Sequence, residues 1–511
     1  MSVFLLGIDL GTSGSKAVLV SEDGRVVGSA SHGYSTSRPR PSWSEQAPNE
    51  WWAATVKSIR AVMEESDVPP EEIVGVGLTG QMHGLVLLDD KGEVLRPALL
   101  WNDQRTGAEC EAITKRLGPE RVIELTGNPV LPGFTAPKIE WVRQHEPDVF
   151  SNTAQVLLPK DYIRYRLTET FATDVSDASG TSLFDVEHRR WSDEMTDALE
   201  VPDAWLPEVS ESPEVRAQVS REAAEVTGLS EGTPVVGGAG DQAAQAIGTG
   251  AVNEGSVVIT LGTSGVVFAP SDEYRVDPDG RLHAFCHAVP GQWHLMGVML
   301  SAAGSLQWYH DEMWQAAFGG TASEERYEQL FEAAATVPAG AEGLLFLPYL
   351  SGERTPHADP DARGVFFGLH LRHQQKHMAR AILEGVAFGL RDSLELMRGL
   401  GVVPNDVSVS GGGAQSPLWR QILADVLNVS VVHTTSPHGA ALGAALLAGV
   451  GAEVYPDVPS ASQAVYQEAG RATPMEDVEA YEALYERYQA LYPTLAGEFE
   501  ALSETIRAIE E

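Results

Sequence analysis

Residues 8–14 read IDLGTSG, and residues 259–265 read ITLGTSG. Six of the seven letters are the same, and the one that differs is Asp9 against Thr260. The two copies lie 251 positions apart, which is about half of the 511-residue chain. An internal duplication of one folding unit explains this spacing better than chance. We therefore predict two related units, each opened by the same loop.

Both copies lie in a strand–turn–strand pattern. Residues 1–35 predict three strands joined by turns, and residues 257–269 predict a second strand–turn–strand. A turn built from Gly, Thr and Ser exposes backbone N–H groups and hydroxyls that can cradle phosphate oxygens. A single loop of this kind is explained equally well as a tight turn. Two copies in equivalent contexts predict that one polyphosphate is gripped from two sides.

Two acids belong to this pattern. Asp9 ends the first strand at the mouth of its loop, where a hard carboxylate suits Mg²⁺, with water between them. One acid is enough to anchor one ion, so the second copy can carry Thr260. Asp241 follows the glycine turn GGAG and precedes an Ala-rich helix, whose N-terminus stabilises an ionised carboxylate. The alternative for Asp241 is an ordinary helix N-cap.

Charge narrows the range of partners. The 72 acidic residues outnumber the 35 Lys and Arg, giving a net charge of −37. A field this negative argues against binding to nucleic acid or to an anionic membrane. We expect a soluble cytoplasmic protein, and we interpret the acidity as a sign of a salt-loving host, since salt screens self-repulsion. The alternative is an acidic protein from a GC-rich genome, which would also favour Arg over Lys.

The chain is too long for one core, so two large domains are expected. Beyond the loops, strands and helices alternate, which predicts an α/β fold. A buried strand at 73–80 runs into QMHG, a helix covers about 374–398, and a glycine-rich stretch follows at 407–415. The tail from Met475 predicts an amphipathic helix that ends at Pro493 and packs onto a domain.

Several separated stretches between about residues 5 and 450 resemble the FGGY family of carbohydrate kinases. They are IDLGTSGSK, GFTAPKIEWVRQH (133–145), GVFFGLHLRHQQKHMARAILEG (364–385), GGAGDQAA and SGGGAQ. Within the family, the xylulokinase branch is the most similar. The stretches that indicate it are RPRPSWSEQAPNEWW (38–52), GQMHG (80–84), LLWNDQR (99–105), LLPKDYIRYRLTETFATDVSDASGT (157–181), FCHAVPGQWHLMGVMLSAA (285–303) and LPYLSGERTPH (347–357).

The resemblance implies a fold and a site. It implies two RNase H-like domains of the actin/hexokinase-like ATPase type with an interdomain cleft, ATP as donor and Mg²⁺ as cofactor. Asp241 matches the catalytic base, which also contacts the sugar, and Asp9 matches the metal-associated acid. Met82 and His83 match the substrate-contact pair of xylulokinases. The residues that match nucleotide positions are Thr12, Ser13, Gly262, Thr263, Gln307, Gly411, Gly412 and Gly413.

Three further residues are candidates for sugar binding. Gln242 stands where many xylulokinases carry Asn, and it can make the same contacts from one methylene further out. Trp101 and Asp103 form a second candidate cluster, for which a core Trp with a helix cap at Asn102 or Asp103 is an equal alternative. A lone His such as His83 is usually structural, and the family match favours the functional interpretation.

We expect an N-terminal domain at 1–245 with the sugar site, a nucleotide-binding domain at 246–450, and a helical segment at 451–511 that packs back on the first domain. The expected substrate is a small sugar, D-xylulose, and the alternatives are ribulose, glycerol or gluconate. A homodimer is one expectation, since dimers are frequent in such kinases. A rival of another class is a nucleotide-dependent sensor, which needs no base, so both acids argue against it.

Overall fold

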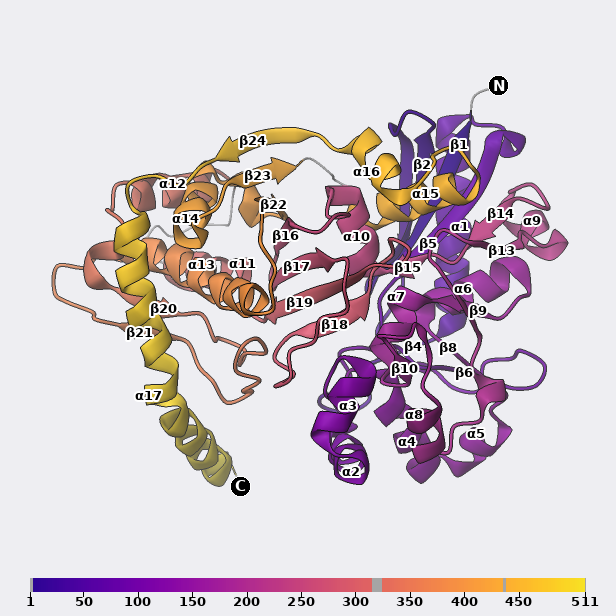
Figure 1. Cartoon of the computed structure of the whole chain (residues 1–511), viewed down its shortest axis with the longest axis horizontal. Helices are drawn as coiled ribbons and strands as arrows, with labels where there is room; N and C mark the ends of the chain where they lie inside the picture. Colours follow the sequence, from indigo (N-terminus) through magenta and orange to yellow (C-terminus); the bar gives the residue numbers. More distant parts are fainter. Residues whose placement is uncertain (1–2, 315–323, 435–437, 511) are drawn as a thin grey trace. The chain divides into compact units, whose positions relative to one another are not determined.

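The computed structural model describes residues 3–314, 324–434 and 438–510. Its contacts divide the chain into two compact units, both visible in Figure 1. Unit 1 contains Met1–Asn253, Pro270–His294 and Ser436–Tyr466, and unit 2 contains Glu254–Ala269, Leu295–Thr435 and Gln467–Glu511. The chain therefore passes between the units at five points, whereas the sequence suggested passages near residues 245 and 450.

The main sheet of unit 1 has the strand order β13-β14-β5-β1-β2-β3, and β15 also pairs with β5. Strands β1, β5, β14 and β15 are parallel, while β2, β3 and β13 run antiparallel to their neighbours. The predicted three-strand opening is thus confirmed. The bounds are β1 (Phe4–Leu10), β2 (Gly14–Ser21), β3 (Val26–Gly33), β5 (Ile73–Gly80), β13 (Val215–Gln218), β14 (Pro234–Val236) and β15 (Ala239–Gly240).

Short strands and helices complete unit 1. The helices are α1 (Pro48–Ser66), α2 (Gly107–Leu117), α3 (Pro119–Thr126), α4 (Thr135–His145), α5 (Pro147–Asn152), α6 (Pro159–Thr168), α7 (Val175–Ala178), α8 (Asp193–Ala198), α9 (Arg221–Thr227), α10 (Asp241–Thr249), α15 (Gly439–Gly451) and α16 (Val458–Val465). The short strands are β4 (Glu45–Gln46), β6 (Val86–Leu88), β7 (Ala98–Leu99), β8 (Gln155–Leu157), β9 (Ala172–Asp174), β10 (Phe184–Asp185), β11 (Arg190–Trp191), β12 (Glu208–Ser210) and β18 (His283–Cys286).

Strand β1 has a different helix on each of its faces, because successive side chains of a strand point to opposite sides. Leu6, Ile8 and Leu10 belong to the same buried cluster as Trp51 of α1. Leu5 belongs to a second cluster, built with α10 and α15. By the same alternation Asp9 lies on the α10 and α15 face of the sheet, whereas its neighbours Ile8 and Leu10 anchor the strand in the other core.

Helix α15 crosses β1 and β5 at glycines. A Cβ added at Gly7 or Gly77 would overlap the backbone carbonyl oxygen of Ala441 or Ala444, respectively. The same closeness recurs where α15 meets α10, since a Cβ at Gly443 would overlap the Ala244 carbonyl oxygen. Small residues on both surfaces therefore let the helix backbone lie directly on the sheet. This contact brings the N-terminal end of the chain against a helix from beyond residue 438.

We expect Gly77→Ala to lower Tm by about 6–12 °C, because the clash is with backbone and about 3 kcal/mol of overpacking strain follows. Gly107→Ala is the matched control, since a Cβ at Gly107, the first residue of α2, meets nothing within 4 Å. Thermal melts of both variants, followed by circular dichroism, measure the difference. Equal melting temperatures for the two variants would contradict this account of the helix–sheet contact.

Unit 2 repeats the sheet of unit 1. Its strands run β19-β17-β16-β22-β23-β24. The pairs from β17 to β24 are antiparallel, parallel, parallel and antiparallel, the same succession as from β2 through β1, β5 and β14 to β13. This is the arrangement that an internal duplication predicts. The bounds are β16 (Ser256–Leu261), β17 (Gly265–Ser271), β19 (Trp293–Met299), β20 (Leu345–Leu347), β21 (Val365–Phe367), β22 (Asp406–Ser410), β23 (Val431–Thr434) and β24 (Glu468–Ala472).

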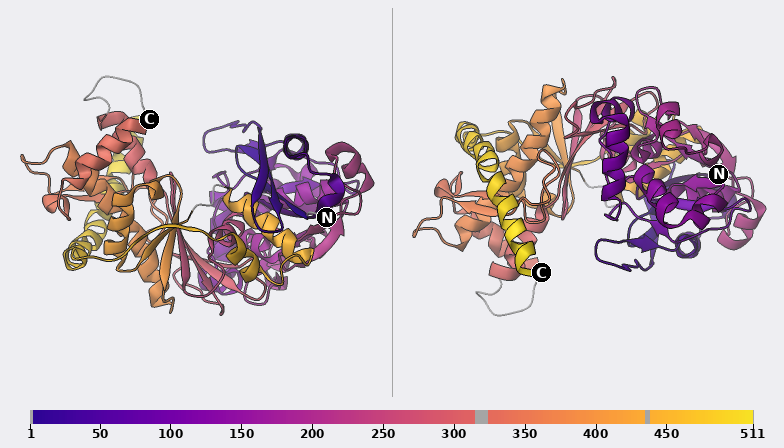
Figure 2. Two further views of the ribbon diagram at one scale, coloured as in Figure 1. Left: turned by 90° about the horizontal axis from the view of Figure 1, so that it is seen from above. Right: turned by 90° about the horizontal axis from the view of Figure 1, so that it is seen from below.

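The C-terminal helix differs from the sequence-based predictions in its length and in its packing. Helix α17 (Val478–Glu510) continues through Pro493, where the sequence predicted its end. It packs on α13, α14 and β20 and belongs to unit 2 (yellow in Figure 2), whereas residues 451–466 of the same predicted segment belong to unit 1. Contacts on both sides of the proline hold the helix together, since Tyr488 and Phe499 are both buried. The helices of unit 2 are α11 (Ala303–Tyr309), α12 (Glu324–Ala335), α13 (Gln375–Gly399), α14 (Pro417–Leu427) and α17.

Candidate active site

Three parallel strands of unit 1 end in register. Asp9 of β1 pairs with Thr79 of β5, and Thr79 also pairs with Ala239 of β15. One residue further on, Gly80 is paired with both Leu10 and Gly240 by the same register. The loop 11–13, the loop QMHG and Asp241 therefore begin at one edge of the sheet. The carboxyl ends of parallel strands are where α/β folds bind ligands.

Asp241 is close enough to Asp9 to affect its ionisation. Burial raises the pKa of Asp9 to about 7; the negative charge of Asp241 adds to this rise, and Lys16 opposes it. Lys16 lies directly across the β1–β2 hairpin from Asp9. Burial also raises the pKa of Asp241, to about 6. A carboxylate whose charge is disfavoured by burial and by a second carboxylate is stabilised by a nearby cation.

Asp241 is the first residue of α10, and Gly240 before it is the N-cap, without a side-chain cap bond. Asp241 is therefore not the ordinary N-cap that the sequence left open. Its carboxylate accepts hydrogen bonds from the backbone N–H and the side-chain amide of Gln242, and both bonds lower its pKa against the effect of burial. In this arrangement the Gln242 amide orients Asp241.

The loop after β1 is held by side chains from elsewhere in unit 1. The Gln46 amide donates to the Thr12 carbonyl oxygen (2.7 Å), and the Trp101 indole N–H donates to the Thr12 hydroxyl (3.1 Å). The hydroxyl of Tyr34 donates to the Gly11 carbonyl oxygen. Ser13 is exposed at the tip of the loop. The loop is thus fixed in shape while its tip stays open to solvent.

Met82 packs directly against the backbone beside Asp241, and its neighbour His83 packs against Gly180. A Cβ added at Gly240 would lie 2.7 Å from the Met82 sulfur, and one added at Gly180 would lie 2.5 Å from His83 Cε1. His83 Nδ1 is hydrogen-bonded to the Gly180 carbonyl oxygen (2.7 Å). Its ring stacks on Phe134 with centroids 4.4 Å apart. Glycines at 180 and 240 therefore make room for the predicted sugar-contact pair.

The backbone of His83 has a strained conformation and is held by hydrogen bonds from side chains of α4. Its φ of +68° lies in the left-handed region that non-glycine residues rarely adopt. The His83 carbonyl oxygen accepts from Lys138 Nζ (2.9 Å) and from the Thr135 hydroxyl (3.1 Å). Lys138 also donates to the Gly133 carbonyl oxygen (2.6 Å), and burial lowers its pKa to about 7. A buried lysine thus holds the loop that carries His83.

The structure separates the candidates Trp101 and Asp103. Asp103 is fully buried; it forms a two-pronged ion pair with Arg105 (2.9 and 2.7 Å) and accepts from the Ser44 backbone N–H (2.6 Å). Both of its oxygens accept hydrogen bonds within the fold, which favours support of the loop over the predicted sugar contact. Trp101 is 42% exposed and is therefore not the core tryptophan of the alternative interpretation.

Unit 2 presents two loops at the corresponding edge of its own sheet. Thr260 of β16 pairs with Ser410 of β22, so the loops that start at Gly262 and Gly411 are neighbours. A Cβ at Gly411, where φ is +91°, would lie 2.6 Å from the Leu261 carbonyl oxygen, whereas one at Gly412 would meet nothing within 4 Å. The backbone at Gly412 is therefore open to a ligand, and the packing at Gly411 keeps the two loops together.

The start of α11 is tied to the second GTSG loop. The Ala303 backbone N–H donates to the Gly262 carbonyl oxygen (2.8 Å), and the Ala302 N–H donates to that of Thr263 (2.9 Å). Gln307, one turn along α11, is exposed. These bonds order the loop from its carbonyl side, as Gln46 does for the first copy.

Among the residues that the structure describes, no group of three or more His, Cys, Asp or Glu side chains could hold a metal ion. Asp9 and Asp241 nevertheless fit Mg²⁺, because hard carboxylate oxygens suit this ion and it usually keeps water and phosphate oxygens as further ligands. In the described part of the chain, no helix is both long and apolar enough to cross a membrane.

Gln46 and Lys138 are site residues that residue-by-residue reasoning missed. Both lie inside stretches that carried the family resemblance, 38–52 and 133–145, but neither residue type has an obvious chemical role there. Gln46 acts through the backbone of Thr12 and Lys138 through that of His83. Contacts of a side chain with a distant backbone leave no periodic pattern in the sequence.

Comparison with known proteins gives one consistent result. The N-terminal domain model of the FGGY family of carbohydrate kinases matches residues 4–248, and the C-terminal domain model matches residues 257–452. The chain is 43% identical over 498 residues to the xylulose kinase of Escherichia coli, covering 96% of this chain and 99% of the relative. It is 45% identical over 455 residues to the xylulose kinase of Klebsiella pneumoniae, covering 89% and 91%.

A solved structure agrees with these relatives. The crystal structure of xylulose kinase from Rhodospirillum rubrum superposes with a TM-score of 0.91 at 33% identity, covering 97% of this chain and 100% of that one. The similarity therefore extends over both units and is not confined to the two glycine-rich loops.

Proposed function

This chain belongs to the FGGY family of carbohydrate kinases, and we propose that it transfers the γ-phosphate of ATP to the terminal hydroxyl of D-xylulose, giving D-xylulose 5-phosphate. The relatives that are similar over nearly its whole length are xylulose kinases. The observation that best supports this proposal is the packing of Met82 on Gly240, directly beside Asp241. This contact supports one shared site for the sugar-contact pair of the xylulokinase branch and the candidate base.

Asp241 is the proposed base. It takes the proton of the sugar's terminal hydroxyl as that oxygen attacks the γ-phosphate. A carboxylate with a pKa of about 6 is a weak base, which suffices because the nucleophile of a loose phosphoryl-transfer transition state loses its proton late. Alignment of the hydroxyl then matters more than basicity. Gln242 contributes by orienting the Asp241 carboxylate.

Asp9 is the proposed metal-associated acid. Mg²⁺, when bound, supplies positive charge to the phosphate oxygens. Asp9 provides the carboxyl group beside the first loop, and burial raises its pKa. Nucleotide contacts are proposed for the two GTSG loops, α11 and the glycine turn after β22. The residues are Thr12, Ser13, Gly262, Thr263, Gln307, Gly411, Gly412 and Gly413.

Met82 and His83 are proposed to face the sugar. A ketose pocket needs fixed polar groups beside an apolar wall, and the His83 ring and the Met82 thioether supply one of each. His83 Nδ1 is hydrogen-bonded to the Gly180 carbonyl oxygen, which fixes the orientation of the ring. Trp101 is the third proposed contact, since its indole is anchored to Thr12 and its surface is exposed.

The test is ADP release with Mg-ATP and a panel of D-xylulose, D-ribulose, L-ribulose, glycerol and gluconate. We expect D-xylulose to give by far the highest kcat/KM. A higher value for another polyol would keep the kinase chemistry but reassign Met82 and His83. Absence of turnover with every substrate would instead favour the nucleotide-dependent sensor, against which both carboxylates now argue.

Salt dependence, location and assembly are finer proposals. The net charge of −37 leads us to expect activity that rises with KCl, and the same panel at low and at molar KCl measures it. Full activity without molar salt would contradict a salt-loving host. Use of ATP as donor places the proposed reaction in the cytoplasm. The homodimer stays a prediction.

A further inference from the structure

The segment Asp174–Thr181 contacts the candidate site at two points. The Ser176 hydroxyl accepts from the backbone N–H of Gly240 (3.1 Å), the residue before Asp241. The Gly180 carbonyl oxygen is bonded to the ring of His83 (2.7 Å). One buried segment therefore touches both the base and the sugar-contact pair, although none of its side chains is among the proposed catalytic groups.

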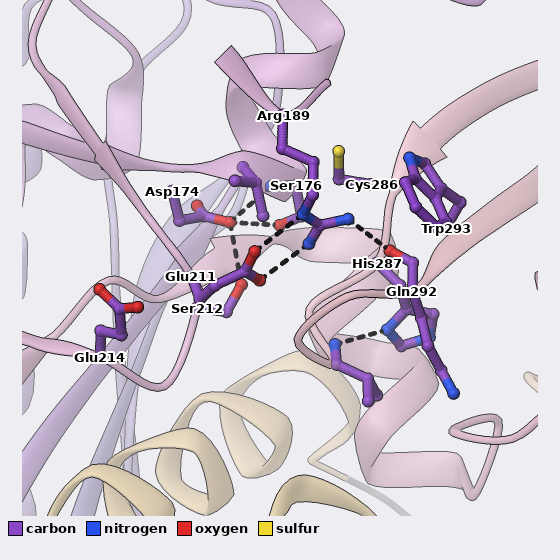
Figure 3. A network of polar contacts seen from close by, with 12 residues as sticks. Asp174, Ser176, Arg189, Glu211, Ser212, Glu214, Cys286, His287, Gln292 and Trp293 are labelled. Atoms are coloured by element: carbon purple, nitrogen blue, oxygen red, sulfur yellow. Dashed lines mark hydrogen bonds and ion pairs between the residues drawn. The ribbon is translucent and has the colours of Figure 1, made fainter. Parts of the chain in front are cut away.

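The direction of the Ser176 hydroxyl is set by Asp174. One carboxylate oxygen of Asp174 accepts from the Ser176 hydroxyl (2.5 Å) and from the Ser176 backbone N–H (2.8 Å). The same oxygen accepts from the Ser212 hydroxyl (3.0 Å), so that it lies between the two serines in Figure 3. Because the Ser176 proton points to Asp174, a lone pair of its oxygen is left for the Gly240 N–H.

The backbone segment to which Ser176 is hydrogen-bonded is rich in glycine, so its own residues restrain its conformation little. Three of the four residues before Asp241 are glycines, at 237, 238 and 240, and glycine loses more conformational freedom on folding than any other residue. β15 consists of two residues, paired with the end of β5. A hydrogen bond at the last glycine therefore restrains the position from which Asp241 projects.

The network behind Asp174 is fully buried and charged. Lys160 Nζ lies 3.1 Å from one Asp174 oxygen and 2.5 Å from Asp161. Burial lowers the pKa of Lys160, but the carboxylates around it outweigh that effect and raise the pKa above its ordinary value. The lysine therefore stays protonated, and its charge compensates the buried carboxylates around it.

We propose that Ser176 is a positioning residue for phosphoryl transfer: oriented by Asp174, it holds the Gly240 backbone so that Asp241 meets the sugar hydroxyl in line. The inference rests on the proposed function of Asp241 and names a new part of the same site. It predicts an effect on turnover and not on the binding of either substrate, since Ser176 is buried behind the strand.

The experiment compares Ser176→Ala with Ser212→Ala in the full chain. Each variant removes one hydroxyl from the same Asp174 oxygen, but only Ser176 also bonds to Gly240. We expect Ser176→Ala to lower kcat about 10- to 100-fold with both KM values within about threefold, and Ser212→Ala to change kcat less than about threefold. Thermal melts are expected to show similar losses of stability for the two variants.

A double-mutant cycle separates positioning from structural damage. In an Asp241→Asn background, Ser176→Ala is expected to lower kcat by less than a further factor of about three. The reason is that its effect acts through the carboxylate that this background lacks. A full additional loss in that background, equal losses for both serines, or a raised sugar KM at unchanged kcat would each overturn the proposal. If Ser176→Ala does not fold, Ser176→Cys, whose thiol donates and accepts weakly, takes its place.

Failure of the proposed function gives a different result. If wild-type protein does not use D-xylulose, the substrate panel shows it, and the serine comparison is then run with the best substrate of the panel. The ratio of the two alanine variants does not depend on which sugar is phosphorylated.

Discussion

Replacing Asp241 with asparagine lowers kcat for D-xylulose by about 10²- to 10⁴-fold, while the Kd of ATP stays within about threefold of wild type. Asparagine keeps the size of the side chain and cannot take a proton. Gln242 can still bond to the amide oxygen, so the start of α10 keeps its shape. Steady-state ADP release measures kcat, and calorimetry with ATP in the absence of sugar measures binding.

Asp177→Asn is the matched control for this variant. Asp177 is a second buried aspartate of unit 1, and its charge and that of Asp241 repel each other. Burial raises the pKa of Asp177 well above its ordinary value; Lys160 opposes this rise, and the neighbouring carboxylates add to it. This rise favours the uncharged form of the carboxyl, which asparagine resembles, so kcat should stay within about threefold. Near-normal turnover of Asp241→Asn would remove Asp241 from the mechanism.

Gly180→Ala is expected to lower kcat/KM for D-xylulose roughly 30- to 150-fold, mostly through a higher KM. The added methyl would lie 2.5 Å from His83 Cε1. His83 cannot move aside cheaply, because its ring stacks on Phe134 and Lys138 holds its carbonyl oxygen. Loss of its hydrogen bond and its position corresponds to about 2–3 kcal/mol of binding. Kinetics over a range of sugar concentrations separates KM from kcat.

Gly107→Ala serves again as control, since it adds the same methyl in unit 1 at a place where nothing lies within 4 Å. The KM for ATP should be unchanged in both variants, because the change at Gly180 acts on His83 and leaves the two GTSG loops intact. A normal sugar KM in Gly180→Ala would mean that His83 does not contact the sugar, and its strained backbone would then need another explanation.

Much of the local structure could be predicted from short patterns. The repeated GTSG loop, the strand at 73–80 and the Ala-rich helix after Asp241 are all present. These predictions hold because alternation and turn chemistry act within a few residues of each other. The predicted stop at Pro493 is wrong for the opposite reason. Tertiary packing of Tyr488 and Phe499 outweighs a local signal that in isolation would end the helix.

The candidate site residues also divide into those that short local patterns predict and those whose role depends on distant contacts. Asp9 and Asp241 could be singled out because each follows a strand at a glycine-rich turn, a setting that the letters display directly. Asp103 could not be assigned in the same way, since its partners Arg105 and Ser44 decide its role and Ser44 lies far away in the sequence. Gln46 and Lys138 were missed because they act on backbone atoms of other segments.

By itself, the sequence of this protein determined the duplicated sheet, the two GTSG loops and the kinase family. These features rest on residue types and spacings that recur along the chain. Only the tertiary structure decided which residues share the site in unit 1. Glycines let α15 lie on β1 and β5, and the parallel register of β1, β5 and β15 sets Asp9, Met82 and Asp241 at one sheet edge. Register and close approach depend on pairs of distant residues, so no single stretch of sequence carries them.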